Sequence, residues 1–176
     1  MRVLGIDCGS RATGFGIIES DEERHRVVTF GAIQFHSKDP FSQRLVKIHT
    51  EIQKLILKYS PHATAVEDQF YLSNFKSVMK LGQVKGVAIF TAACSGIPVF
   101  EYSPLEIKGA VTGYGRAEKN QVQTMVKNLL KLETLPRPDD AADALALAIC
   151  HIHTMTTRCK IDVADHPTSR ILKNFV

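Results

Sequence analysis

Long apolar runs free of charge and of helix-breaking residues are missing from this sequence of 176 residues. A membrane-spanning helix needs about 20 consecutive apolar residues. The nearest approach, residues 86–100, is interrupted by Ser95, Gly96 and Pro98. The N-terminus begins directly on a strand-like run that ends at Asp7, which is unlike a signal peptide. The sequence therefore predicts a cytoplasmic protein without a membrane segment.

Cysteine is scarce, and no two cysteines form a C-x-x-C pair. The four are Cys8, Cys94, Cys150 and Cys159. The first three have apolar or small neighbours in the sequence, which is typical of reduced structural thiols. His151 and His153 lie two residues apart, hence on different faces of a helix, and no cysteine spacing matches a zinc site. We therefore interpret both histidines as structural or surface residues.

The overall charge is only mildly positive, at +4, but its distribution is uneven. Residues 69–132 carry eight basic and three acidic side chains, a balance of +5 that exceeds the excess of the whole chain. Such a stretch favours an anionic partner such as nucleic acid. The hydrophobic content of 44% and the charged content of 23% are those of a globular protein with one full core.

Strand and helix patterns alternate along most of the chain. The predicted strands are residues 2–7, 13–19, 26–35, 63–67 and 97–102. The predicted helices are residues 41–59, 74–93, 104 to about 113, 118–132 and 140 to about 157. Three strands followed by alternating helices and strands predict an α/β protein with a ribonuclease H-like fold, in which helices flank a mixed five-stranded sheet. We assign this domain to residues 1–157 and expect the polar tail, residues 158–176, to be partly disordered.

Helix caps support several of these boundaries. Asp39 and Pro40 predict the N-cap and the first position of the helix at residues 41–59. Ser103 is followed three residues later by Glu106, which predicts a capping box. Asp139 is expected to cap the last helix.

Four carboxylates lie in or at the ends of apolar segments, where burial of an ionised side chain is costly. Asp7 and Glu67 end apolar runs that we predict to be neighbouring strands, and the carboxyl ends of such strands border the functional crevice of an α/β sheet. Asp140 and Asp143, spaced i, i+3, share one face of an otherwise uncharged helix. No lysine or arginine is placed along the sequence as a close neutralising partner. Converging carboxylates predict a site for hard divalent cations, such as two Mg²⁺ ions about 4 Å apart.

Each carboxylate also has an ordinary explanation. Asp140 could favour the helix dipole, Asp7 could belong to a turn, and Glu67 could be a surface residue at the end of a strand. Asp143 is harder to explain in this way, because it lies in the sequence AADALALA, which is built for tight packing. Coincidence can explain any one of the four carboxylates, but it explains all four together much less well.

Residues that could grip nucleic acid follow the second acidic segment. Phe70 and Tyr71 could stack on unpaired bases or pack under their own loop. Lys76 and Lys80 share a helix face on which they could contact phosphates. The predicted DNA contacts are Phe70, Tyr71, Lys76, Lys80, Lys85, Lys108, Arg116 and Lys119.

Two glycines, Gly82 and Gly86, stand in the middle of a predicted helix, where glycine costs up to about 1 kcal/mol relative to alanine. They suggest close approach of another element. The sequence leaves open whether that element is the sheet of the same chain or a second copy of the helix across a two-fold axis.

Several motifs occur together in order and with regular spacing: GIDCG, TGFG, VE at 66–67, KLGQVKG, EYSP, VTGYG and DAADALA. Over residues 1–157 they resemble the bacterial RuvC-type Holliday-junction resolvases, the crossover junction endodeoxyribonucleases. The resemblance implies a homodimer that binds a four-way DNA junction and nicks two strands of like polarity. It further implies a Mg²⁺-dependent hydrolase of DNA recombination and repair, with two Mg²⁺ per subunit that Mn²⁺ can replace, and a branch-migration helicase as partner.

The resemblance also assigns residue roles. The acidic tetrad falls on Asp7, Glu67, Asp140 and Asp143, and two catalytic lysines that face the phosphate fall on Lys108 and Lys119. The aromatic residue that contacts the junction falls on Phe70, and the helix at residues 74–93 becomes the dimer helix. Asp68 and Asp139, each adjacent to a tetrad member, add acidic charge without replacing a ligand.

Two other functions fit part of the pattern. The D-C-G-S sequence at residues 7–10 also suits the phosphate loop of an actin-like ATPase or sugar kinase, but no second glycine-rich nucleotide loop follows. A scaffold that binds junctions and recruits another nuclease would not need an intact tetrad. A cleavage assay titrated with Mg²⁺ separates these functions.

Overall fold

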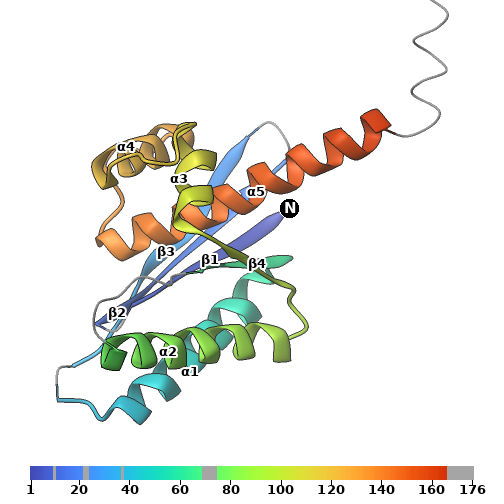
Figure 1. Cartoon of the computed structure of the whole chain (residues 1–176). Coiled ribbons are helices and arrows are strands. Elements are labelled where there is room, and N and C mark those ends of the chain that lie inside the picture. Colours follow the sequence, from blue (N-terminus) through green and yellow to red (C-terminus); the bar gives the residue numbers. More distant parts are fainter. Residues whose placement is uncertain (10, 22–23, 37, 69–74, 166–176) are drawn as a thin grey trace, which may run out of the picture.

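A five-stranded mixed sheet with helices on both faces forms the centre of the computed structural model (Figure 1). The structure describes residues 1–9, 11–21, 24–36, 38–68 and 75–165. The strands are β1 (Arg2–Cys8), β2 (Ala12–Ser20), β3 (His25–Gln34), β4 (Ala63–Glu67) and β5 (Val99–Tyr102). The helices are α1 (Phe41–Tyr59), α2 (Phe75–Cys94), α3 (Pro104–Thr112), α4 (Lys119–Leu129) and α5 (Asp139–Asp165). The predicted ribonuclease H-like order of elements is confirmed.

The sheet has the order β3-β2-β1-β4-β5. β1, β2 and β3 form the predicted antiparallel meander, whereas β4 lies parallel to both β1 and β5. Ile6 pairs with Val66, so that the next residues, Asp7 and Glu67, lie beside each other at the carboxyl ends of their strands. The parallel pairing therefore places two predicted site residues at one edge of the sheet.

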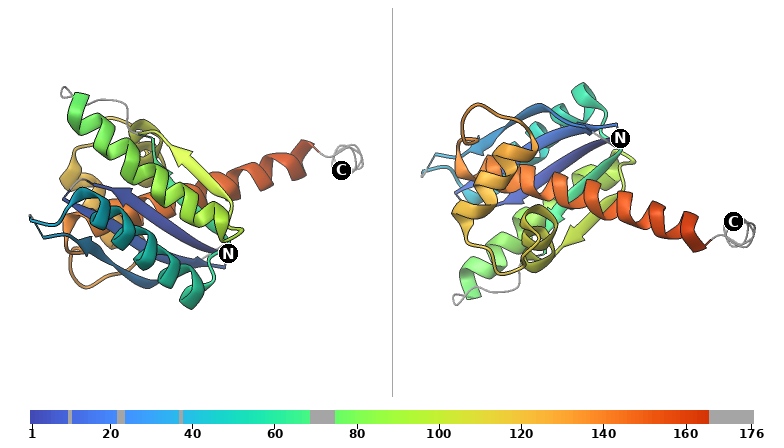
Figure 2. Two further views of the ribbon diagram at one scale, coloured as in Figure 1. Left: turned by 90° about the horizontal axis from the view of Figure 1, so that it is seen from below. Right: turned by 90° about the horizontal axis from the view of Figure 1, so that it is seen from above.

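Different helices cover the two faces of the sheet (Figure 2), and the two faces bury different side chains. Leu4, Ile6 and Val66 pack toward the face that α1 and α2 cover. Val3 and Ala65 alternate with them and pack toward α3, α4 and α5. Because side chains alternate along a strand, the odd-numbered Asp7 and Glu67 share the face of α5. Burial of each large core side chain stabilises the fold by about 1.5–3 kcal/mol.

Helix α5 lies unusually close to the strands β1 and β2. A Cβ atom on Gly5 would stand 1.9 Å from the carbonyl oxygen of Ala144, and one on Gly14 would stand 2.0 Å from that of Asp140. Both glycines are therefore required for backbone-to-backbone packing. This packing presses the first turn of α5, with its two aspartates, against the end of the sheet.

Several predicted helix boundaries need correction. Pro40, and not Asp39, occupies the N-cap of α1 without a side-chain cap, and the Asp39 carboxylate accepts the backbone N–H of His36 instead. The capping box of Ser103 and Glu106 is confirmed. Helix α5 runs eight residues beyond the predicted end at residue 157, because the sequence holds neither glycine nor proline between positions 139 and 166.

Of the cysteines that the structure describes in full, Cys8 and Cys150 are buried free thiols, as predicted. Cys94 is exposed, because it ends α2 at the surface, so its predicted place among packed residues was wrong. Within the described part of the chain, no helix is both long and apolar enough to span a membrane.

The buried His151 links α5 to β5 and makes folding sensitive to acid. Its Nδ1 shares a 2.8 Å hydrogen bond with the hydroxyl of Tyr102, and its ring packs against Phe100. Burial, with a smaller contribution from Arg158, lowers the pKa of His151 to about 4. The unfolded chain therefore takes up a proton near pH 6.5 that the folded protein refuses until about pH 4, so the free energy of unfolding falls across this window as pH falls.

We expect the acid loss through His151 to reach up to about 3 kcal/mol between pH 7 and pH 4. Urea unfolding at a series of pH values measures it. The variant His151→Asn keeps a polar partner for Tyr102 but does not titrate, so its unfolding free energy should vary less with pH. Equal pH dependence in the two proteins would contradict this role of His151.

Candidate active site and metal centre

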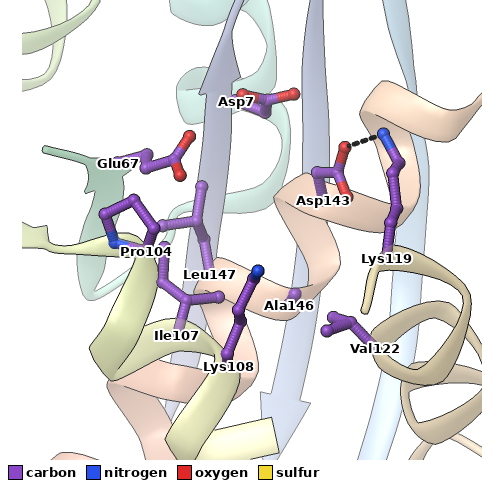
Figure 3. A pocket seen from close by; sticks show the side chains of 10 residues that line it. All are labelled: Asp7, Glu67, Pro104, Ile107, Lys108, Lys119, Val122, Asp143, Ala146 and Leu147. Carbon is purple, nitrogen blue, oxygen red and sulfur yellow. Dashed lines mark hydrogen bonds and ion pairs between the residues drawn. The ribbon is translucent and has the colours of Figure 1, made fainter. Parts of the chain in front are cut away.

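A cavity of about 350 Å³ opens at the carboxyl edge of the sheet, where β1, β4, α3, α4 and α5 meet (Figure 3). Its lining residues are Asp7, Glu67, Pro104, Ile107, Lys108, Lys119, Val122, Asp143, Ala146 and Leu147. Three of the four predicted acids and both predicted catalytic lysines are thus brought together from segments far apart in the sequence. The rest of the wall is apolar.

The carboxylates reach this cavity from different elements. Asp7 is near the end of β1, Glu67 ends β4, and Asp143 comes from the first turns of α5; all three stand around the same cavity (Figure 3). Asp140 is not part of the lining. It lies one turn before Asp143, over Gly14, the residue that pairs with Asp7 in the sheet. The predicted tetrad is therefore gathered at one place, with Asp140 at its border.

The negative charges around the cavity affect the pKa of Asp7. The pKa of Asp7 is raised to about 7, first by burial and then by the charges of Asp143, Glu67 and Asp140 in that order of influence, while Lys119 opposes them. Burial also raises the pKa of Asp143, against the effect of Lys119. Carboxylates that destabilise one another's ionised form are relieved by a bound cation.

Asp143 has a close cationic partner, contrary to the expectation from the sequence. The ammonium of Lys119 at the start of α4 donates a 2.8 Å hydrogen bond to its Oδ2. Twenty-four positions separate the two residues, so only the packing of α4 on α5 brings them together. Lys108 points into the cavity from α3 (Figure 3). The site thus combines acids with two lysines that can face an anionic group.

The donor set suits a hard divalent cation, because it consists of carboxylate oxygens on a partly buried edge. Within the described residues, however, no three His, Cys, Asp or Glu side chains stand in an arrangement that could hold a metal ion. In the ion pair with Lys119, one carboxylate oxygen of Asp143 already accepts a hydrogen bond. The described residues fit such a cation in their donor chemistry, and to bind it their side chains would have to turn toward one another.

Asp68 and Asp139, the two acids adjacent to the tetrad, are engaged elsewhere. The Asp68 carboxylate accepts a 2.7 Å hydrogen bond from Lys85, and Asp139 pairs with Arg137. Neither lines the cavity, although the charge of Asp139 still acts on Lys119 and Asp143. That neither is a metal ligand stays a prediction.

The predicted DNA contacts are distributed unevenly. Phe70 and Tyr71 lie outside the described residues. Lys76 and Lys80 are exposed on α2, and Arg116 is exposed on the loop before α4. Lys85, by contrast, is buried to a large extent between two carboxylates. No pattern along the sequence indicates this pairing.

Sequence reasoning missed the apolar wall of the cavity. Ala146 and Leu147 stand three and four positions after Asp143, so the helical period that paired Asp140 with Asp143 could have identified them. Ile107 stands one position before Lys108 on α3, and Val122 stands three positions after Lys119 on α4. No pattern along the sequence points to these two.

We expect Gly14→Ala to damage the site without touching a carboxylate. The added methyl group would collide with the backbone of Asp140, so the first turn of α5 must shift. Overpacking of this kind costs about 1–3 kcal/mol of stability, and displacement of catalytic groups by about 1 Å can cost about 100-fold in rate. Urea unfolding and cleavage of a four-way DNA junction measure the two effects.

Gly109→Ala on α3 is the matched control for Gly14→Ala, since no atom lies within 4 Å of the added carbon. It should be neutral or slightly stabilising, because alanine is the better helix former. If both variants behave alike, the contact between Gly14 and α5 does not position the site.

Comparisons with known proteins agree with this geometry. A family model described as "Crossover junction endodeoxyribonuclease RuvC" matches residues 3–151. Proteins of that name from Syntrophomonas wolfei and Koribacter versatilis are 52% and 51% identical, over 88% and 89% of this chain and 90% and 95% of theirs. Thermus thermophilus RuvC superposes with a TM-score of 0.82 at 32% identity, covering 89% of this chain and 96% of that one. A T. thermophilus RuvC structure in complex with Holliday junction substrate matches with the same TM-score and coverage at 29% identity.

Proposed function

The chain belongs to the RuvC family of crossover junction endodeoxyribonucleases, and from this premise we propose that it resolves four-way Holliday junctions in DNA recombination and repair by paired, symmetric nicks. The observation that carries the proposal is the convergence of Asp7, Glu67 and Asp143 with Lys108 and Lys119 on one cavity. Carboxylates for a cation and cations for a phosphate are the two requirements of phosphodiester hydrolysis.

The chain's own residues divide the work of hydrolysis. Asp7, Glu67, Asp140 and Asp143 would hold the metal, which we take to be Mg²⁺, two per subunit, with Mn²⁺ able to replace it. When bound, such a cation activates water and stabilises the leaving oxygen. Lys108 would contact the scissile phosphate from α3. Attack on phosphorus breaks the bond to the 3′ oxygen, leaving a 5′-phosphate and a 3′-hydroxyl.

Lys119 has a double role in this proposal. In the protein alone it pairs with Asp143, which offsets one of the crowded negative charges. Its side chain lines the cavity and is about half exposed, so a phosphate oxygen can share the ammonium once DNA arrives. Phe70 and Tyr71 remain proposed stacking residues, and Lys76, Lys80 and Arg116 proposed phosphate contacts on the exposed surface nearby.

We further propose that α2 forms the interface of a homodimer. A Cβ atom on Gly82 or Gly86 would meet nothing within 4 Å, so these glycines do not serve packing against the sheet of their own chain. Phe75, Met79 and Phe90 share their helix face and are 77%, 51% and 62% exposed. An apolar helix face with small residues at its centre suits close contact with a second copy of itself.

A homodimer would present two equivalent cavities to the junction, as symmetric nicking requires. We also propose that the protein acts in the cytoplasm, because a resolvase must act where recombining bacterial DNA is found. Its proposed partner there is a branch-migration helicase. The kinase-like alternative lacks support, since the chain belongs to a different family.

A cleavage assay tests the proposed function. The protein should nick a synthetic four-way junction at symmetric positions in the presence of Mg²⁺, leave linear duplex of the same sequence intact, and stop when EDTA removes the metal. Junction binding without cleavage at any concentration of Mg²⁺ or Mn²⁺ would favour the scaffold instead. Calorimetry with ATP covers the remaining alternative, for which the expected result is no binding.

A further inference from the structure

Lys85 stands apart from the other lysines of α2. Its ammonium lies 2.7 Å from Oδ1 of Asp68 and 2.5 Å from Oε2 of Glu101, and its side chain is only 19% exposed. These three residues, here called the Lys85 triad, come from α2, the end of β4 and β5. Two of the three N–H donors of the ammonium are thus committed to carboxylates, which leaves little of the charge for a DNA phosphate.

The Lys85 triad lies directly behind Glu67. Asp68 follows Glu67 in the chain, and its backbone N–H donates to the carbonyl oxygen of Tyr102, which pairs with Glu67 in the sheet. Side chains alternate along β4, so Glu67 faces the cavity while Asp68 faces α2. Lys85 therefore holds the segment that carries Glu67 from the opposite side of the sheet.

The Lys85 triad also neutralises the charge of Asp68 next to Glu67. Asp68 is about one-third exposed, and without Lys85 its carboxylate would be an unpaired, partly buried charge one residue from Glu67. An uncompensated charge in such a place turns toward water or toward a cation and moves the backbone that carries it. Glu101 is about half exposed, so water can solvate it if Lys85 is lost.

We propose that Lys85 is a positioning residue for the nuclease reaction: it neutralises Asp68 on the α2 side of the sheet and so prevents an unpaired charge there from displacing the end of β4, which directs the Glu67 carboxylate into the cavity. This inference rests on the proposed function. It assigns Lys85 a role other than the DNA contact expected from the sequence. It also makes a specific claim about Asp68: the harm done by removing Lys85 is caused by the charge that Asp68 then carries unpaired.

The test combines single and double variants in cleavage of a four-way junction at saturating protein, well below the melting temperature of each variant. Lys85→Met should lower the cleavage rate by about 10- to 100-fold, as is usual when a group that orients a ligand is lost. Junction affinity should change by less than about threefold, because Lys85 does not contact phosphate. Asp68→Asn alone should remain close to the wild type, since Lys85 keeps Glu101 as its partner.

The double variant Lys85→Met/Asp68→Asn carries the decisive prediction. It has the net charge of the wild type at this place, and its cleavage rate should recover to within about threefold of the wild type. Lys54→Met, which breaks only the exposed ion pair with Glu51, is the matched control and should leave rate and affinity unchanged. Melting temperatures of all variants check that they fold, and Lys85→Arg, which retains both ion pairs, should cleave well if Lys85→Met fails to fold.

Two results would overturn the role of Lys85. A double variant as slow as Lys85→Met would mean that Asp68 is not the cause of the loss. A fall in junction affinity as large as the fall in rate would make Lys85 a phosphate contact. If the wild-type protein itself does not cleave junctions, the proposed function fails, and that failure is separate from either result.

Discussion

Asp7→Asn is expected to reduce junction cleavage by at least about 1,000-fold while junction binding persists. The carboxylate of Asp7 is largely buried and lies within the electrostatic reach of the other three acids. An amide has half the oxygen donors and no charge, so the variant loses its hold on a cation while its shape is kept. Metal assistance contributes several kcal/mol to such reactions, and each 1.4 kcal/mol is tenfold in rate.

Binding should survive this change because Asp7 carries a negative charge that repels phosphates, and its removal costs no DNA contact. Single-turnover cleavage and a gel-shift assay in Ca²⁺ measure rate and affinity separately. Asp139→Asn is the matched control: it makes the same acid-to-amide change at a residue that does not line the cavity and that pairs with Arg137. This control should cleave within about twofold of the wild type, and a normal rate for Asp7→Asn would remove the assigned site.

Gly86→Glu is expected to convert the protein to a monomer that no longer makes paired nicks. In the single chain the position is open, since a Cβ atom added to Gly86 meets nothing within 4 Å. Replacement of a glycine in a helix should stabilise the isolated chain by up to about 1 kcal/mol. Across a two-fold axis, however, two added carboxylates would meet in a close-packed apolar contact, where unpaired charges cannot be accommodated.

For Gly86→Glu, sedimentation equilibrium measures the loss of the dimer. Mapping the nick positions on both DNA strands measures the loss of paired cleavage. Gln53→Glu places the same charge on the exposed surface of α1 and should leave the dimer and its activity intact. A Gly86→Glu protein that remains dimeric would show that α2 is not the contact between subunits.

The sequence was most informative where function follows from position along an element. Asp7 and Glu67 end strands, and the parallel pairing of those strands could be predicted from the helix between them. Asp140 and Asp143 share a helix face by their spacing alone. The capping box at Ser103 was equally local and was equally well predicted.

The missed ion pairs have a common physical cause, which is that they depend on tertiary contact, whereas the errors at Asp39 and at the end of α5 are local. The pairing of Lys119 with Asp143 spans 24 positions, and that of Lys85 with Asp68 spans 17, so no local pattern encodes either. Asp39 was a plausible cap by residue type, but its side chain bonds to His36 instead. The end of α5 was placed too early because its polar composition resembles a tail, although it contains no residue that stops a helix.

Diffraction from crystals soaked in Mn²⁺, recorded at the manganese absorption edge, tests most directly whether the gathered carboxylates are a metal centre. We predict anomalous density in the cavity between Asp7, Glu67 and Asp143, with Lys119 released from Asp143, and no such density in crystals of Asp7→Asn. Density only at other places, or none in the wild-type cavity, would contradict the assignment of these acids as metal ligands.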